Sequence, residues 1–435
     1  MISSAIFILI LVAGVLFFAR NVRKIISNIK LGRPLERNDQ KGLRWKVMSL
    51  VALGQSKMLT RPVAGIFHVI IYVGFIIINI EVLEIIIDGI FGTHRIFAAP
   101  LGGVYDILIG SFEILAFAVL VACVIFLIRR NIMHIGRFRS PELKGWPFND
   151  ANIILVSEVI LMGLFLTMNA TDQILQSRGH GHYHEAGLFP VSTLLTPLFA
   201  GMSDPSLVLI ERTAWWLHIV GILAFLNYVP YSKHFHIFLS FPNTWYSNLD
   251  PKGKFTNLDS VTTEVKLMLD PSATPPEASG APERFGAKDV RDLTWKNLMD
   301  AYSCTECGRC TSVCPANITG KKLSPRKIMM DTRDRLEVVG DNVKKHGPEH
   351  DDGKSLLHDH ISSEELWACT TCNACVEACP VNIDPLSIIV EMRRYLVMEE
   401  SSSPAELNGM FTRMENNGAP WQFSQADRMK WTEEQ

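Results

Sequence analysis

The sequence has 435 residues, enough for two or three domains, and 48% of them are hydrophobic, which is high for a soluble protein. The formal net charge is only -2, so the overall charge gives no indication of a nucleic-acid partner. Nine cysteines are present, and eight fall in two short runs in the last third of the chain, which favours metal ligands over scattered disulfides. The ninth, Cys123, lies in an apolar stretch and is expected to be a small packed side chain.

Five segments are apolar for long enough to cross a bilayer, which takes about 20 residues. They run roughly from 3 to 19, 63 to 90, 104 to 128, 152 to 170 and 212 to 232. The first has neither a basic region before it nor a small-residue cleavage site after it, so we expect an uncleaved anchor rather than a signal peptide. The sequence therefore predicts a multi-pass protein of the cytoplasmic (inner) membrane.

Lysine and arginine are concentrated in the loops that follow the first and third segments, between residues 20 and 61 and between residues 129 and 144. The other two loops contain few of them. By the positive-inside rule, both basic loops face the cytoplasm. The chain after residue 232, with its eight cysteines, is then expected on the cytoplasmic side as well.

Histidine is costly in lipid, so histidines at membrane segments are candidate cofactor ligands. His218 and His236 are 18 residues apart, which in an unbroken helix is five turns and places both on one face, with His234 nearly opposite. His68, near the start of the second segment, is expected at a depth similar to that of His236. Such a pair suits a b-type haem held by two imidazoles. A structural histidine pair is the alternative.

The stretches "RPVAGIFHVIIYVGF" and "LHIVGILAFLNYVPYSKHFHIF" resemble the cytochrome b (gamma) subunit of respiratory nitrate reductase. The same fold anchors membrane-bound heterodisulfide reductase. In that family two histidines on one helix pair with two on another to hold two haems, and His68, His218 and His236 match three of these positions. Ile78 stands at the fourth. The resemblance therefore implies one haem b, while a second, which would use His218, lacks its partner ligand.

Residues 241–285 lose the apolar runs and contain "DPSATPPEASGAPERFGAKD", a composition typical of an extended connector. We therefore divide the chain into a membrane domain at 1–240, a linker at 241–285, a cysteine-rich domain at 286–400 and a C-terminal tail at 401–435 that is expected to dock a partner.

Both cysteine runs have the pattern C-x2-C-x2-C-x3-C-P. The first consists of Cys304, Cys307, Cys310 and Cys314, and the second of Cys369, Cys372, Cys375 and Cys379. In two-cluster ferredoxins the first three cysteines of a run bind one [4Fe-4S] cluster and the fourth binds the other. One cluster is thus expected on Cys304, Cys307, Cys310 and Cys379, and the other on Cys369, Cys372, Cys375 and Cys314. Two zinc sites are the alternative, because paired C-x2-C runs also bind zinc, but the third and fourth cysteines and the proline favour clusters.

Some fifty residues separate the runs, and their character is helical and charged, with Ser324 and Pro325 as one predicted helix start and Ser362 or Ser363 as another cap. This spacer and the stretch "WACTTCNACVEACPVNIDPLSIIVEMRRYLVM" resemble the α-helical ferredoxin of succinate dehydrogenase and of the heterodisulfide reductase C-like family. The resemblance covers roughly residues 286–400. The expected fold is mainly α: a five-helix transmembrane bundle of the cytochrome b type, followed by an α-helical ferredoxin domain with two [4Fe-4S] clusters.

The last residues, "GAPWQFSQADRMKW", resemble the segment that precedes a domain with two Cys-Cys-Gly-type repeats in related iron-sulfur oxidoreductases. This sequence contains no adjacent pair of cysteines, so we expect such a unit on a separate partner protein. The resemblance is to fused membrane-bound oxidoreductases of the heterodisulfide reductase-like type that are proposed to pass electrons between electron-transfer flavoprotein and menaquinone.

The sequence shows no dinucleotide-binding G-x-G-x-x-G after a strand, no P-loop and no nucleophile with its base, so no catalytic residue is assigned. We predict an electron-transfer subunit of a quinone-linked oxidoreductase complex. A membrane iron-sulfur redox sensor or maturation factor is the alternative, and neither of these would need a bis-histidine haem.

Overall fold

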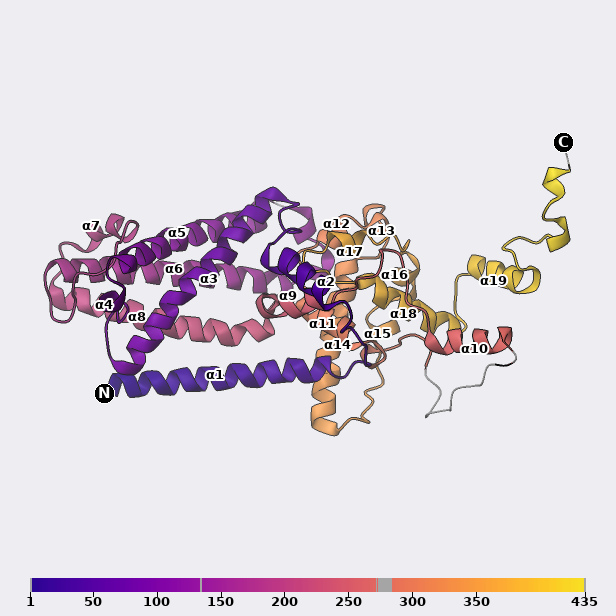
Figure 1. The fold of residues 1–435 in the computed structure, drawn as a ribbon, viewed down its shortest axis with the longest axis horizontal. Helices are drawn as coiled ribbons and strands as arrows, with labels where there is room; N and C mark the ends of the chain where they lie inside the picture. Colours follow the sequence, from indigo (N-terminus) through magenta and orange to yellow (C-terminus); the bar gives the residue numbers. More distant parts are fainter. Residues whose placement is uncertain (1, 134, 271, 273–283, 434–435) are drawn as a thin grey trace.

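The computed structural model describes residues 2–133, 135–270, 272 and 284–433. The chain is mainly α-helical, as predicted, and these ranges contain no β-strand. Figure 1 shows an elongated molecule in which long helices occupy one end and the cysteine-containing domain packs against the other. We call the long helices the membrane bundle and residues 286–400 the cysteine domain.

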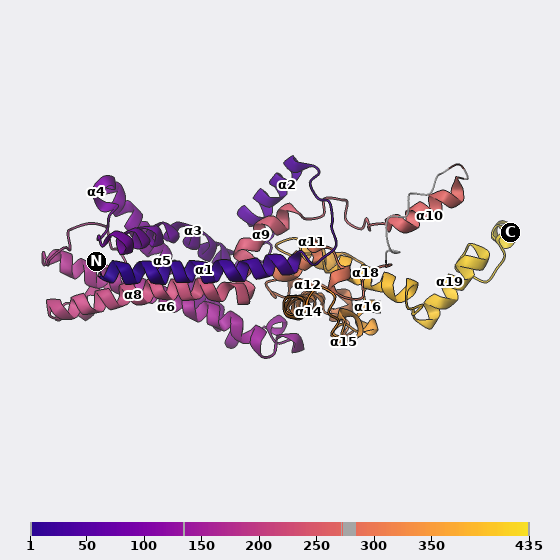
Figure 2. The ribbon, with the colours of Figure 1, turned by 90° about the horizontal axis from the view of Figure 1, so that it is seen from below.

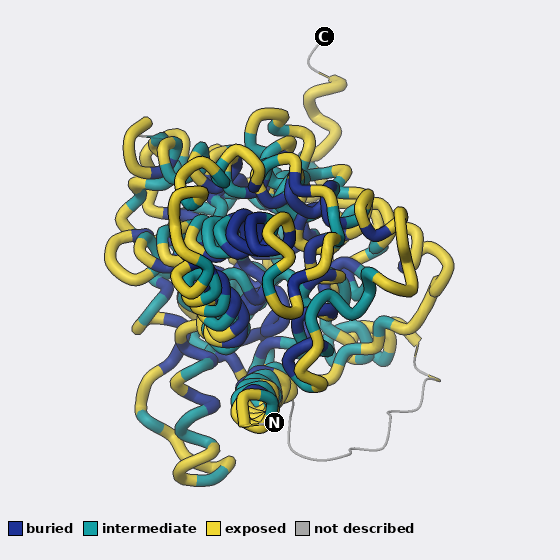
Figure 3. The backbone as a smooth tube through the Cα atoms, turned by 90° about the vertical axis from the view of Figure 1, so that its left-hand side faces the viewer, coloured by how far each residue is buried: buried dark blue, intermediate teal, exposed yellow. Residues whose placement is uncertain are grey.

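The described chain has five helices that are long and apolar enough to cross a membrane, in agreement with the prediction. They are α1 (Ile2–Ile29), α3 (Pro62–Phe91), α5 (Gly103–Asn131), α6 (Trp146–Ser177) and α8 (Asp204–Tyr228). Helices α3, α5, α6 and α8 pack together, and α1 lies along α3 and α8. Only 6% of the apolar window of α1 is buried, against 28–33% for the others. Figure 3, viewed along the bundle, shows α1 exposed at the edge, so it would meet lipid on most of its surface.

The bundle has a polar interior at the end away from the cysteine domain. Arg95 lies in the connection between α3 and α5, and its guanidinium donates to Asp172 Oδ2 at 2.6 Å, to Asn169 Oδ1 at 3.0 Å and to the Tyr105 hydroxyl at 3.1 Å. The Arg95 side chain is 8% exposed. A buried charge persists only when it is paired and hydrogen-bonded. This group therefore ties α5, α6 and their connecting loop together.

Helix α1 extends well beyond the apolar segment predicted at residues 3–19 and reaches the cysteine domain (Figure 2). Asn28 donates from Nδ2 to the Tyr302 hydroxyl at 2.8 Å. Lys24 pairs with Glu337 at 2.9 Å between Nζ and Oε2. Both partners belong to the cysteine domain, so α1 connects the two parts of the molecule as a continuous rod.

The two parts share one apolar core. Ile25 of α1, Val229 after α8 and Phe235 are buried in the same cluster of side chains as Leu298 and Ile328 of the cysteine domain. Burial of apolar side chains on both sides of a boundary stabilises the contact between them. The cysteine domain is thus packed on the end of the bundle.

The cysteine domain is built from helices joined by the two cysteine loops. The helices are α11 (Trp295–Ser303), α12 (Arg309–Ser312), α13 (Pro315–Ile318), α14 (Pro325–His346), α15 (Leu356–Asp359), α16 (Ser363–Trp367), α17 (Ala374–Ala378) and α18 (Pro385–Met398). Two predicted helix starts are confirmed: Ser324 caps α14, and Ser362 caps α16 with a capping box.

The predicted connector contains helical structure of its own. Helix α9 (His236–Trp245) continues past residue 241, and Asn243 donates from Nδ2 to the carbonyl of Val381 at 2.9 Å. Helix α10 (Asp259–Leu269) follows, and residues 271 and 273–283 of the connector lie outside the described chain. Figure 2 shows α10 and the tail helix α19 (Ala405–Asn417) projecting beyond the cysteine domain.

Candidate metal centres

The two cysteine loops have the same backbone conformation. Glu306 and Gly308, which flank the second cysteine of the first run, have φ of 54° and 70°. Thr371 and Asn373, at the equivalent positions of the second run, have φ of 54° and 60°. Glycine and asparagine adopt this left-handed region more readily than other residues. The repeated pattern therefore bends both loops around their cysteines in the same way.

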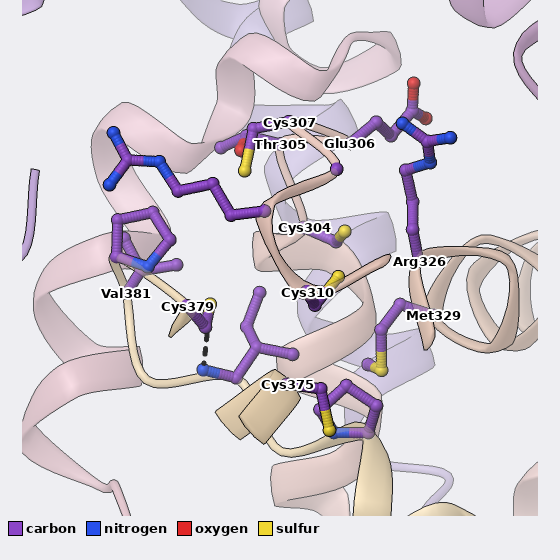
Figure 4. Close-up of a pocket in the computed structure, with 15 residues that line it drawn as sticks. Cys304, Thr305, Glu306, Cys307, Cys310, Arg326, Met329, Cys375, Cys379 and Val381 are labelled. Atoms are coloured by element: carbon purple, nitrogen blue, oxygen red, sulfur yellow. Dashed lines mark hydrogen bonds between the residues drawn. The ribbon is translucent and has the colours of Figure 1, made fainter. Parts of the chain in front are cut away.

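Cysteines from both runs line one cavity in the cysteine domain (Figure 4). They are Cys304, Cys307 and Cys310 from the first loop and Cys379 from the second. Cys375 also borders the cavity, but its side chain points away from the other four sulfurs. The four that surround the cavity are the set expected to share one cluster, and this ligand set remains a prediction.

The remaining cysteines form a second group closer to the surface. The charges of Cys314 and Cys372 act on Cys369, and those of Cys314 and Cys369 act on Cys375, so the four lie near one another. Cys372 is exposed. Cys375 also acts on Cys310, so the two groups adjoin.

The thiols of both groups are difficult to ionise without bound metal. Burial raises the pKa of Cys304, Cys375 and Cys379 to about 12, and neighbouring sulfurs add to the effect. Iron supplies the positive charge that four adjacent thiolates need, so cluster binding would release protons. The donor set therefore fits an iron-sulfur cluster.

Backbone N–H groups also point at sulfur. The amide of Ile383 donates to Cys379 Sγ at 3.3 Å, and that of Thr371 donates to Cys369 Sγ at 3.4 Å. Hydrogen bonds to ligand sulfurs are one of the factors that set the reduction potential of a cluster. Each group of cysteines thus has a backbone donor that would act on its cluster.

His68 and His236 lie face to face where α3 meets the cysteine domain. Their ring centroids are 6.3 Å apart and their planes are inclined at 42°. Two imidazoles bound on opposite sides of one metal ion at about 2 Å place their centroids about 6 Å apart. His236 Nδ1 donates to the carbonyl of Lys233 at 3.1 Å, which leaves Nε2 free to bind, and His68 Nδ1 is buried with no partner among the described residues. The pair therefore fits the two axial ligands of a haem.

The structure corrects one expectation about these histidines. His218 and His236 do not share a helix face, because α8 ends at Tyr228 and two short turns precede α9, which begins at His236. Pro230 lacks the N–H that a continuing helix needs. The break also brings His234 to the same side as His236, with ring centroids 5.5 Å apart, instead of opposite it.

The break leaves both of these imidazoles neutral. Burial lowers the pKa of His234 to about 3 and also lowers that of His236. A neutral imidazole is the form that binds a metal. His234 is therefore a neighbour of the proposed haem site that the helical spacing did not reveal.

His218 has a different setting. It is 1% exposed, its Nδ1 donates to the carbonyl of Leu161 at 3.0 Å, and its ring lies 5.9 Å from that of Phe165. Ile78, at the position of the missing fourth ligand, is an apolar side chain buried in the bundle core. These residues do not fit a second haem, and we derive no step from one.

Glu306 joins the first cavity to the histidine pair. It lines the cavity, and its carboxylate pairs with Lys233 and accepts from Arg333 at 2.8 Å. The backbone carbonyl of Lys233 in turn holds His236. Arg309 makes a parallel connection, because it lines the same cavity and donates to the carbonyl of Met58 in the loop before α3.

Comparison with known proteins agrees with this chemistry. Residues 303–383 match the family described as "4Fe-4S dicluster domain". The chain carries a 4Fe-4S dicluster domain. The match begins next to Cys304 and ends beyond Cys379, so it includes both runs. No solved structure matches the chain.

The relatives are iron-sulfur oxidoreductases, which confirms the resemblance seen in the sequence. A probable iron-sulfur-binding oxidoreductase, FadF, of Bacillus subtilis is 30% identical over 99% of this chain and 61% of its own length. The EtfAB:quinone oxidoreductase of Syntrophomonas wolfei is 29% identical over 92% of this chain and 55% of its own length. One component of the dihydromethanophenazine-dependent CoB–CoM heterodisulfide reductase of Methanosarcina acetivorans is 30% identical over 33% of this chain and 35% of its own length. The chain thus spans about 55–61% of the two relatives that it matches over most of its sequence.

Proposed function

We propose that this chain carries electrons between a soluble redox partner and a quinone in the membrane, through two [4Fe-4S] clusters and one haem b. When bound, these groups would take up and release single electrons. The observation that carries the proposal is the continuous contact from the first sulfur cavity through Glu306 and Lys233 to His236. It supports a cluster site and a haem site on either side of one buried ion pair.

Each residue has a distinct role in this proposal. One cluster is held by Cys304, Cys307, Cys310 and Cys379, and the other by Cys369, Cys372, Cys375 and Cys314. The crossed pattern ties the two loops together through metal. Because Cys372 is exposed, the second cluster site is the one that a soluble partner can approach. His68 and His236 hold the haem, and Lys233 fixes the orientation of His236 through its carbonyl.

The proposal includes a cytoplasmic location for the cysteine domain. Both basic loops, at residues 20–61 and 129–144, lie at the end of the bundle that carries this domain (Figure 1). The positive-inside rule supports a cytoplasmic location for that end. Electrons would then cross from a cytoplasmic partner to the membrane through the junction between the two parts.

Two soluble partners are proposed. The name of the Syntrophomonas relative supports electron-transfer flavoprotein, EtfAB, and a quinone, for which we expect menaquinone. A Cys-Cys-Gly-type redox unit is the second, and the tail at 401–435 would dock it. Helix α19 has no buried residue, and apolar side chains such as Met414, Trp421 and Phe423 are exposed along the tail, as a docking segment requires.

Quinone-dependent reoxidation tests the proposal. Reduction of one quinone to quinol takes up two electrons and two protons, so chemically reduced clusters of the purified chain should be reoxidised by a menaquinone analogue in that ratio. The rate should be higher in lipid discs than in detergent that extracts the quinone. A redox sensor or maturation factor would show no quinone-dependent reoxidation, and that result would refute the proposed function.

A further inference from the structure

A second cavity lies at the junction of the membrane bundle and the cysteine domain. It has a volume of about 260 Å³ and is formed by α1, the start of α6, the broken stretch after α8, and helices α11 and α14. Glu306 lines this cavity as well as the first sulfur cavity. The position is therefore adjacent to a cluster site, and Lys233, which also lines it, contacts His236 through its carbonyl.

Asn21 of α1 gives this cavity an unused hydrogen-bond donor. Its side chain is 9% exposed, and its Oδ1 accepts from the Tyr231 hydroxyl at 2.9 Å. Its Nδ2 is buried and has no partner among the described residues. A buried donor without an acceptor is unfavourable. Both residues line the cavity, so the free N–H groups mark a place for an acceptor atom there.

The charges around the cavity are not arranged for an anion. Its lining carries three cations, Lys24, Lys233 and Arg333, and four carboxylates. Each cation is already paired: Lys24 with Glu337, and both Lys233 and Arg333 with Glu306. A phosphate would find no uncommitted positive charge and a net negative lining. A neutral ligand with an acceptor oxygen fits better.

The rest of the lining is apolar and lies at the boundary of the bundle. Ile25, Phe235, Pro230 and Trp146 contribute to it. Trp146 is the first residue of α6 and is 54% exposed, as is typical of tryptophan at a membrane surface. Helix α1 packs mainly on α3 and α8 rather than on α6, so the cavity lies between elements that lipid can reach.

We propose that this cavity binds the headgroup of a membrane quinone, with Asn21 Nδ2 donating to one ring carbonyl. A quinone is neutral and flat, carries two acceptor oxygens, and has an apolar tail that remains in lipid. The site rests on the proposed function and assigns its quinone to the cysteine-domain end of the bundle. Ligand sites of this type combine an apolar lining with a few placed polar groups.

Photolabelling of the full chain in lipid discs tests the site. The probe is a menaquinone analogue with a photoreactive azide on its ring, and the labelled peptides are identified by mass spectrometry. Label is expected in residues 146–150 or 230–235. Label confined to the opposite end of the bundle, or a retained phospholipid that the probe does not displace, would overturn the proposal.

Matched variants sharpen the test. Asn21→Leu removes the donor at nearly constant size and should raise the probe concentration for half-maximal labelling about tenfold. Asn227→Leu is the control, because Asn227 also joins α8 to α1, through the carbonyl of Gly14, but does not line the cavity. Trp146→Ala alters a half-exposed side chain, so it keeps the test valid if Asn21→Leu does not fold, and it should also weaken labelling. Equal labelling of all variants would refute the site.

The two proposals can fail separately. If a quinone reoxidises the clusters equally fast in wild type and Asn21→Leu, the site proposed here is wrong and the proposed function stands. If labelling depends on Asn21 but no quinone reoxidises the clusters of the wild type, the site binds quinone and the proposed function is wrong.

Discussion

The variant Arg326→Met tests whether a buried ion pair holds the cysteine domain on the membrane bundle. The Arg326 side chain has no solvent exposure. Its guanidinium donates from Nη2 to Glu142 Oε1 at 2.8 Å and from Nη1 to the carbonyl of Arg137 at 2.7 Å. Both acceptors lie in the loop between α5 and α6, whereas Arg326 begins α14 beside the first sulfur cavity. Methionine keeps much of the length and removes the charge.

The expected cost follows from the burial of the partner that remains. Removing one member of a buried pair costs about 3–5 kcal/mol. The Glu142 side chain is 11% exposed and keeps a hydrogen bond from the Ser324 hydroxyl at 2.7 Å, so we expect the lower end, about 3 kcal/mol. At about 1.4 kcal/mol per tenfold, the docked loop should open more than a hundredfold more often.

Hydrogen exchange measured by mass spectrometry reads out this opening in residues 136–145. Lys322→Met is the control, since Lys322 forms an exposed pair with Glu364, and exposed pairs contribute about 0–1 kcal/mol. Exchange in 136–145 should accelerate about a hundredfold in Arg326→Met and by no more than a few fold in the control. An effect of Arg326→Met as small as that of the control would refute the docking role of the pair.

The same pair predicts a pH dependence. Burial alone would favour the neutral form of Glu142, but the hydrogen bonds from Arg326 and Ser324 outweigh it, so the pKa of Glu142 is lowered from 4.5. A carboxyl with a lowered pKa contributes stability that is fully present above its ordinary pKa and is lost as the pH falls through the lowered value. The difference in exchange between wild type and Arg326→Met should therefore be constant near neutral pH and shrink below about pH 4.5.

Three further substitutions follow from the sites described above. Cys379→Ser should lower acid-labile sulfide by at least half and destabilise the second site as well, because the crossed ligands share the loops, whereas Cys123→Ala should leave sulfide at about eight per chain; equal sulfide in the two variants would contradict the ligand set. His68→Ala should abolish the b-type α-band in a reduced-minus-oxidised spectrum, and His218→Ala should leave it; loss in His218→Ala alone would exclude the proposed pair. Arg95→Leu should lower the unfolding free energy in detergent by about 3–5 kcal/mol, since it strands a buried carboxylate; an unchanged thermal midpoint would show that the group is not stabilising.

Local patterns predicted much of the fold because they are set by neighbouring residues. The five apolar runs became the five long helices, and the caps at Ser324 and Ser362 lie where a hydroxyl precedes a helical run. The cysteine spacing also brought Cys379 to the cavity lined by Cys304, although 75 residues separate them, because the repeated motif carries tertiary information.

Other features depend on contacts that spacing along one helix cannot report. Pro230 was visible in the sequence, yet a helical count through it gave His236 the wrong orientation relative to His218. The polar residues after the first apolar run, such as Asn21 and Asn28, looked like a loop because nothing local shows that Tyr302 and Tyr231 would meet them. The second cavity was missed for the same reason: its lining comes from five separate elements.

A reductive titration of the purified chain tests the central claim most directly. Two [4Fe-4S] clusters and one haem b each take up one electron, so about three electrons per chain should be consumed, two with bleaching of the cluster absorbance and one with appearance of the b-type band. Uptake of one electron or none, with zinc in place of iron in the protein, would contradict the account.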